Sequence, residues 1–119
     1  MTPEELKQRT KTFGIRAIKV ATALPSGKVG EVVGKQLLRS ATSVGANYRS
    51  ACRGRSRADF ISKIGIAIEE ADEALYWLEV IHEAGLLPPA RLTELSSEAN
   101  ELVAILTATS RTAKQNLRR

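Results

Sequence analysis

Cysteine, histidine and aromatic residues are all scarce in this chain of 119 residues. With Cys52 as the only cysteine, the chain has no intrachain disulfide and no paired-cysteine metal site. His82 is the only histidine, so the Glu-x-x-His pairs of di-metal sites in helical bundles are missing as well. Five aromatic side chains leave any core to Ala, Ile, Leu and Val. The composition favours closely packed helices, and we expect no metal, no cofactor and no catalytic residue.

Long apolar runs are absent too. No segment approaches the roughly 18 apolar residues that a membrane span needs. The first residues include Glu4, Glu5 and Lys7, so the apolar segment of a signal peptide is missing. We therefore expect a cytoplasmic protein with no membrane contact. The length lies near the common domain size and predicts a single domain over residues 1–119.

The most strongly patterned segment is expected to form a helix over residues 56–84. Ser56 is a suitable N-cap, with Asp59 three residues later as in a capping box. Gly85 can close the helix in a left-handed conformation, and the prolines that follow prevent its continuation. Steps of three and four residues place one apolar seam on this helix: Phe60, Ile64, Ala67, Ala71, Leu75, Leu78 and His82. In that seam His82 is expected to be a hydrogen-bonded structural residue rather than a ligand.

Three further helices are expected at about 3–24, 28–52 and 89–115, because apolar residues recur there at helical spacing. Thr2 and Glu5 mark the start of the first. Glycines inside 28–52 indicate a thin helix that contacts its neighbours closely. Long helices joined by short connections fold back on one another. The predicted fold class is all-α: a single-domain, antiparallel, up-down-up-down four-helix bundle.

Charge is unevenly distributed along the chain. Residues 1–57 contain twelve basic and three acidic side chains, whereas residues 58–110 contain two basic and ten acidic ones. Such a division suits a basic face for an anionic partner, or pairing of acidic and basic helices within or between subunits. The densest basic group lies where the second and third helices meet: Arg49, Arg53, Arg55 and Arg57.

These four arginines support two interpretations. Guanidinium groups bind phosphates bidentately, so the cluster could contact a nucleic-acid backbone, with Arg39 as a further contact and Arg16 and Lys35 as extensions. Alternatively, the arginines pair with carboxylates of a neighbouring helix or subunit, and Asp59 is the obvious local partner. No aromatic residue is interleaved with them to stack on bases. The sequence leaves both interpretations open.

Tyr76 and Trp77 lie beside the main seam of the helix over 56–84 and make part of its flank apolar. A single bundle does not need this extra surface, whereas aromatic residues are enriched in subunit interfaces. We therefore predict that both rings lie in an oligomer interface.

Several segments are similar to those of a known family. The stretches L-L-R-S-A-T-S-V-G-A-N-Y-R at 37–49, S-R-A-D-F-I-S-K-I-G-I-A at 56–67 and E-A-D-E-A-L-Y-W-L-E at 70–79 resemble the four-helix-bundle family encoded in intervening sequences of bacterial large-subunit ribosomal RNA genes. The resemblance implies a ring of five with a basic surface. Relatives include the accessory protein of diversity-generating retroelements, which binds a reverse transcriptase and nucleic acid. The glutamate and glycine of the family's frequent N-I-A-E-G segment are absent after Asn47, so no role carries over from them.

We accordingly predict a non-enzymatic homo-oligomer, a pentamer by the resemblance, that acts as a nucleic-acid-binding or scaffolding module through its basic surface. Its partners would be RNA or DNA and, by family analogy, a protein such as a reverse transcriptase. The residues predicted to contact phosphate are Arg39, Arg49, Arg53, Arg55 and Arg57. In the alternative prediction the protein is an interaction scaffold without nucleic acid, and the arginines pair with Glu69, Glu73 or Glu79 across subunit boundaries.

Overall fold

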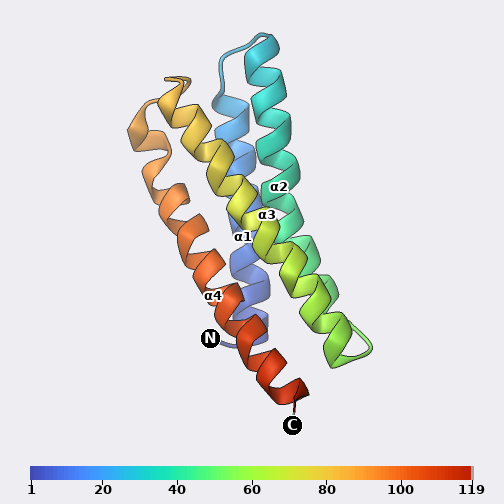
Figure 1. Ribbon diagram of the computed structural model, residues 1–119. Coiled ribbons are helices and arrows are strands. Elements are labelled where there is room, and N and C mark those ends of the chain that lie inside the picture. The colour runs from blue at the N-terminus through green and yellow to red at the C-terminus, as the bar shows by residue number, and fades with distance from the viewer. Residues whose placement is uncertain (119) are drawn as a thin grey trace.

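Figure 1 shows the computed structural model of the protein, which describes residues 1–118. Four α-helices run alternately up and down a body of 51 × 21 × 20 Å. They are α1 (Pro3–Ala23), α2 (Lys28–Cys52), α3 (Arg57–Glu83) and α4 (Thr93–Leu117), with a short 3₁₀ turn, η1 (Pro89–Arg91), before α4. Residues 1–118 contain no strand. The predicted all-α four-helix bundle is confirmed.

Side-chain caps fix the starts of α1 and α3. The Thr2 hydroxyl accepts a hydrogen bond from the Glu5 amide at 3.1 Å, and the Glu5 carboxylate accepts one from the Thr2 amide at 3.2 Å. The bond from the Thr2 backbone is the main reason why the pKa of Glu5 lies below its usual value. In α3 the Ser56 hydroxyl accepts from the Asp59 amide at 3.1 Å, while the Asp59 carboxylate faces Lys63 at 3.4 Å. Both starts therefore rest on an N-cap that the sequence identifies.

The end of α3 depends on Gly85, whose φ of 68° lies in the left-handed region. The Gly85 amide donates to the His82 carbonyl at 3.1 Å, and the Leu86 amide donates to the Ile81 carbonyl at 3.0 Å. These two bonds form a Schellman motif, which satisfies carbonyls that the last turn would otherwise leave unpaired. As a result α3 ends at Glu83, one residue before the predicted position.

The last helix begins later than predicted. We expected it from residue 89, but Pro89–Arg91 forms a 3₁₀ turn and α4 starts at Thr93. Between them Leu92 has φ −121° and ψ −30°, which interrupts the helical path. Only 2% of Leu92 is exposed, so the chain bends here to bury that side chain. Periodicity does not reveal such a break, because a 3₁₀ turn and an α-helical turn place apolar residues at nearly the same spacing.

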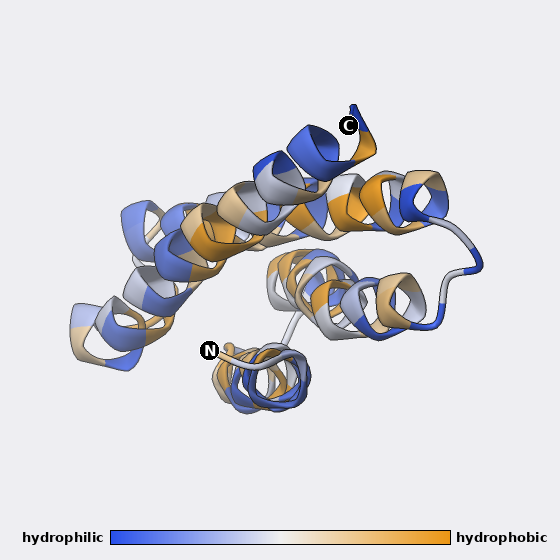
Figure 2. Cartoon of the chain, turned by 90° about the horizontal axis from the view of Figure 1, so that it is seen from below, coloured by the Kyte–Doolittle hydropathy of each residue, from blue (hydrophilic) through white to orange (hydrophobic). Residues whose placement is uncertain are grey.

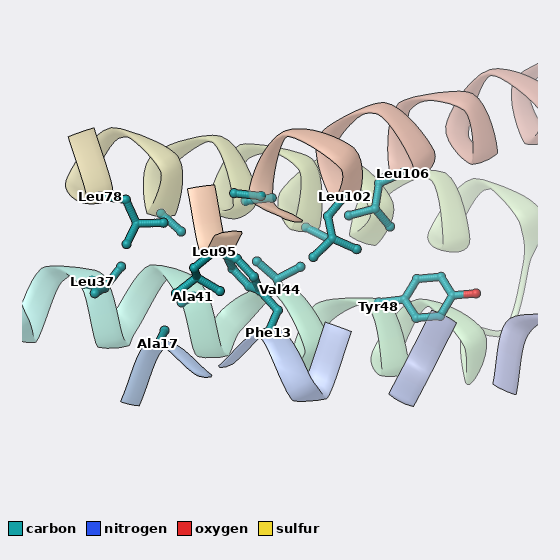
Figure 3. Packing of buried hydrophobic residues seen from close by; sticks show 14 of the residues in the cluster. Phe13, Ala17, Leu37, Ala41, Val44, Tyr48, Leu78, Leu95, Leu102 and Leu106 are labelled. Carbon is teal, nitrogen blue, oxygen red and sulfur yellow. The ribbon is translucent and has the colours of Figure 1, made fainter. Parts of the chain in front are cut away.

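The hydrophobic core runs along the axis of the bundle. Figure 2 shows apolar and polar residues alternating around the helices, as expected for amphipathic elements. Phe13 is the only aromatic residue of the described chain with no exposed surface, and it belongs to the same buried cluster as Val44 and Leu95 (Figure 3). Six alanines also have no exposed surface: Ala17, Ala41, Ala67, Ala71, Ala74 and Ala99. These small side chains let the helices pack closely, as the composition indicates.

The apolar seam of α3 differs from the prediction in its second half. Its buried residues are Ile64, Ala67, Ala71, Ala74, Leu78 and Ile81. Leu75 is only partly buried and His82 is exposed, so the predicted seam and the structural role expected of His82 are wrong here. The physical reason is that α3 carries apolar residues at both Ala74 and Leu75, so spacing alone does not set the phase. Packing against α2 and α4 selects Ala74 and Ile81.

Glycines bring α1 and α2 close together. A Cβ atom added to Gly45 would lie 3.2 Å from the backbone nitrogen of Lys11, and one added to Gly14 would lie 3.3 Å from the Cα atom of Thr42. Both distances are shorter than ordinary contacts of a Cβ atom. The thin second helix predicted from its glycines is therefore present, with its close neighbour being α1.

An ion pair joins the two helices at the ends of the sequence. Figure 2 shows the N-terminal part of α1 and the C-terminal part of α4 set apart, and these helices touch at few points. At one of them, Nε and Nη2 of Arg9 donate to the Glu98 carboxylate at 2.7 Å each, and Nη2 also lies 3.1 Å from Glu101. The bond to Glu98 is the main cause that raises the pKa of Arg9. This bidentate geometry makes Arg9 the principal polar link between α1 and α4.

Replacing Arg9 with glutamine is expected to lower the free energy of unfolding by about 1–3 kcal/mol, because Glu98 is left largely buried without its cation. Urea unfolding followed by circular dichroism measures this. The matched control is Lys7→Gln, which breaks an exposed pair with Glu4 and should cost less than about 0.5 kcal/mol. Equal losses in the two variants would show that the α1–α4 link contributes no more than a surface ion pair.

Candidate nucleic-acid interface

The fold gathers basic residues at one end of the bundle. Figure 1 shows that the N-terminus, the C-terminus and the connection between α2 and α3 all lie at the same end. The exposed cations there, which we call the basic end, are Arg49, Arg53, Arg55, Arg57, Arg111, Lys114 and Arg118. None of them makes an ion pair within residues 1–118. Three separate segments thus contribute uncompensated positive charge to one region.

The four clustered arginines are held by the turn between α2 and α3. Arg53 caps the end of α2, and its amide donates to the carbonyls of Arg49 and Ser50 at 3.3 and 3.1 Å. Ser56 caps the start of α3 three residues later. Asp59 was expected as the local partner of an arginine, but it faces Lys63 instead. The four arginines therefore lie in a short turn and in the two helix ends beside it, and all four are exposed.

Arg39 does not belong to this group. It lies in the middle of α2, about 21 Å along the helix from Arg53 at 1.5 Å per residue. Its guanidinium pairs with Glu70 of α3 at 3.1 Å and also with Glu73. Arg39 is the main cause that lowers the pKa of Glu73, which also accepts a hydrogen bond from Nε1 of Trp77 at 3.1 Å. The charge of Arg39 is thus compensated within the chain, so Arg39 does not belong to the basic end.

Residues of the basic end line two separate grooves. Arg49 and Arg53 line a groove of about 480 Å³ between α1 and α2, together with Lys7 and Lys11 of α1. Arg57 lines a second groove, of about 500 Å³, between α3 and α4. The cluster that appears continuous in the sequence is therefore divided between two sides of the bundle.

The contribution of α4 to the basic end was not predicted from the sequence. Arg111, Lys114 and Arg118 are not among the residues predicted to contact phosphate, yet they belong to the last part of α4, which lies at the same end of the bundle as the arginine turn. The predicted topology contained this information, because in an antiparallel bundle of four helices the last helix ends at the same end of the bundle as the second one. Combining that topology with the charges would have predicted the convergence.

Tyr76 and Trp77 lie away from the basic end. Tyr76 is roughly 29 Å along α3 from Arg57 at 1.5 Å per residue. Its side chain is 56% exposed, while Trp77 is partly buried, and their rings meet edge to face with centroids 5.0 Å apart. Around them α3 is acidic, since no Lys or Arg occurs between Ile64 and Glu83. Their role in an oligomer interface stays a prediction, at a site separate from the cations.

Two further features bear on the class of protein. None of the helices within residues 1–118 combines the length and apolar character needed to cross a bilayer. The same residues contain no group of three or more His, Cys, Asp or Glu side chains arranged to hold a metal ion.

An antiparallel bundle of four long helices with a basic end defines the structural class. Within it, the chain belongs to the 23S rRNA-intervening sequence protein family, whose model matches residues 4–108. The resemblance drawn from the sequence is therefore confirmed. The chain is also similar to a crystal structure from Bacteroides thetaiotaomicron, described as a protein with unknown function from the S23 ribosomal protein family. The two share 33% identity and a TM-score of 0.83, over 88% of this chain and 97% of that one. No curated protein matches the chain.

Proposed function

We propose that the protein is a non-enzymatic nucleic-acid-binding module whose basic end contacts the phosphate backbone. The observation that carries this proposal is the convergence of cations from α2, the α2–α3 turn, the start of α3 and the end of α4 without ion-pair partners in residues 1–118. Such a surface attracts polyanions, and arginine in particular binds phosphate oxygens in pairs. These contacts would position the nucleic acid without reading its sequence.

The proposed assembly is a cytoplasmic homo-oligomer, with five subunits by the family resemblance. Repetition of the basic end around a ring would multiply the number of phosphate contacts and raise the affinity for a long strand. Lys7 and Lys11 in the α1–α2 groove extend the same surface along the side of the bundle.

Charge reversal at the α2–α3 turn tests the proposal. Arg53→Glu with Arg55→Glu should weaken binding to a labelled single-stranded RNA or DNA by about two orders of magnitude at low salt, because two phosphate contacts become repulsive. The slope of log K against log salt should also fall by about 1.4, as two contacts on a single strand are lost. Fluorescence anisotropy over a salt series measures both quantities.

The matched control reverses two cations at the opposite end, Lys19→Glu with Lys28→Glu. Both residues are exposed and make no ion pair within residues 1–118. Because two cations again become carboxylates, the net charge changes by the same amount as in the double arginine variant. This control should bind nearly as well as the unaltered protein. Equal loss in both variants would mean that only net charge matters, and absence of binding by the unaltered protein would refute the proposal.

A second candidate is an interaction scaffold in which the arginines pair with acidic residues of a neighbouring copy or of a protein such as a reverse transcriptase. The acidic part of α3 between residues 64 and 83, which contains no Lys or Arg, favours it, since Glu69 and Glu79 are exposed there. Under this alternative, Arg53→Glu with Arg55→Glu should shift the protein to smaller species on a sizing column. Under the first proposal, the assembly should keep its size while binding is lost.

A further inference from the structure

A shallow groove between α3 and α4 opens beside the basic end. It has a volume of about 500 Å³ and is formed in part by Arg57 and Phe60 of α3 and by Ile105, Thr112 and Asn116 of α4. It thus combines a cation, an aromatic ring, apolar surface and side chains with hydrogen-bonding groups. A groove that served only to pack apolar residues would not need the amide and the guanidinium.

The apolar spacing along α3 predicts a buried seam position for Phe60. In the structure it is only partly buried and lines the groove. It follows Arg57 by three residues, which places both side chains on one face of the first turn of α3. Phe13 and Tyr48 are buried, and Tyr76 and the neighbouring Trp77 lie far along α3. Phe60 is therefore the one aromatic residue of the described chain that reaches the surface at the basic end.

We propose that this groove accepts an unpaired base of a single-stranded nucleic acid, with Phe60 as the stacking surface. The inference rests on the function proposed above and adds the class of nucleic acid. Stacking on an aromatic ring requires a base that is not paired in a duplex. Arg57 is placed to bind the phosphate next to that base, while Asn116 and Thr112 offer hydrogen bonds to its edge. An apolar protein segment in this groove would leave these polar groups unpaired.

The test compares two labelled strands of equal length and charge, one with bases and one built from abasic units. Anisotropy titrations should show that the protein binds the strand with bases about tenfold more tightly, because one base stacks on Phe60. Phe60→Leu should bind both strands equally, with an unchanged salt slope. Phe60→Tyr should keep the preference, since the aromatic ring is retained.

Tyr76→Leu is the matched control, because it removes an exposed aromatic ring far from the groove. It should leave the preference unchanged. Equal binding of the two strands by the unaltered protein would overturn the inference while leaving phosphate binding intact, whereas failure to bind either strand would overturn both proposals. A preference that survives Phe60→Leu would overturn the assignment to this groove. A smaller assembly of Phe60→Leu on a sizing column would overturn it too, by indicating that a second copy fills the groove.

Discussion

Replacing Phe13 with alanine is expected to lower the free energy of unfolding by about 3–5 kcal/mol. Phe13 has no exposed surface and lies in α1 at the centre of the bundle (Figure 3). Its removal would leave a large cavity that the surrounding side chains fill only in part, because the helices around it are fixed by other contacts.

Urea unfolding at one fixed protein concentration measures the loss, since the stability of an oligomer depends on concentration. The control is Ile18→Ala, which truncates a side chain on the same helix that is 46% exposed. Its cost should be well below that of Phe13→Ala, at about 1 kcal/mol or less. A cost for Phe13→Ala as small as that of the control would contradict the packing described for the core.

A leucine at position 45 should destabilise the protein by about 2–3 kcal/mol, because it overfills the contact between α1 and α2. The added side chain would start 3.2 Å from the backbone of Lys11 and Thr10, and backbone atoms cannot move aside as flexible side chains do. The two helices would therefore have to separate. The melting temperature and the urea midpoint of Gly45→Leu measure the effect.

Substitution of another helical glycine, Gly65→Ala, is expected to stabilise the protein, in contrast to Gly45→Leu. A Cβ atom at Gly65 in α3 meets nothing within 4 Å, so alanine there should stabilise the protein by about 0.5–1 kcal/mol through helix propensity alone. If Gly45→Leu proved neutral, the close approach of α1 and α2 would be wrong. If Gly65→Ala proved strongly destabilising, the open surroundings of Gly65 would be wrong.

Local signals were enough to predict much of the fold. Thr2, Ser56 and Gly85 mark helix ends through bonds to residues three to five positions away, and all three act as the sequence indicates. The seam of α3 beyond Ala71 was not predictable in this way. Its phase depends on which of two adjacent apolar residues, Ala74 or Leu75, faces the neighbouring helices, and this depends on packing between helices.

In the candidate site, too, features set by neighbouring residues were predictable, whereas features set by packing between helices were not. The arginines at 49–57 are neighbours in sequence, so their clustering is visible without a structure. The pairing of Arg39 with Glu70 and Glu73 depends on how α2 and α3 are rotated against each other, which periodicity does not define. The exposure of Phe60 likewise reflects its place at the first turn of α3, where the covering helix leaves part of the ring open.

The hydrogen bond between Trp77 and Glu73 gives the protein an intrinsic optical probe. Trp77 is the only tryptophan, and its indole bonds to the carboxylate that also pairs with Arg39 of α2. Fluorescence excited at the indole band therefore reports on the junction of the second and third helices without any attached dye. Time-resolved emission can follow when that junction forms during refolding, separately from the far-ultraviolet signal of the helices as a whole.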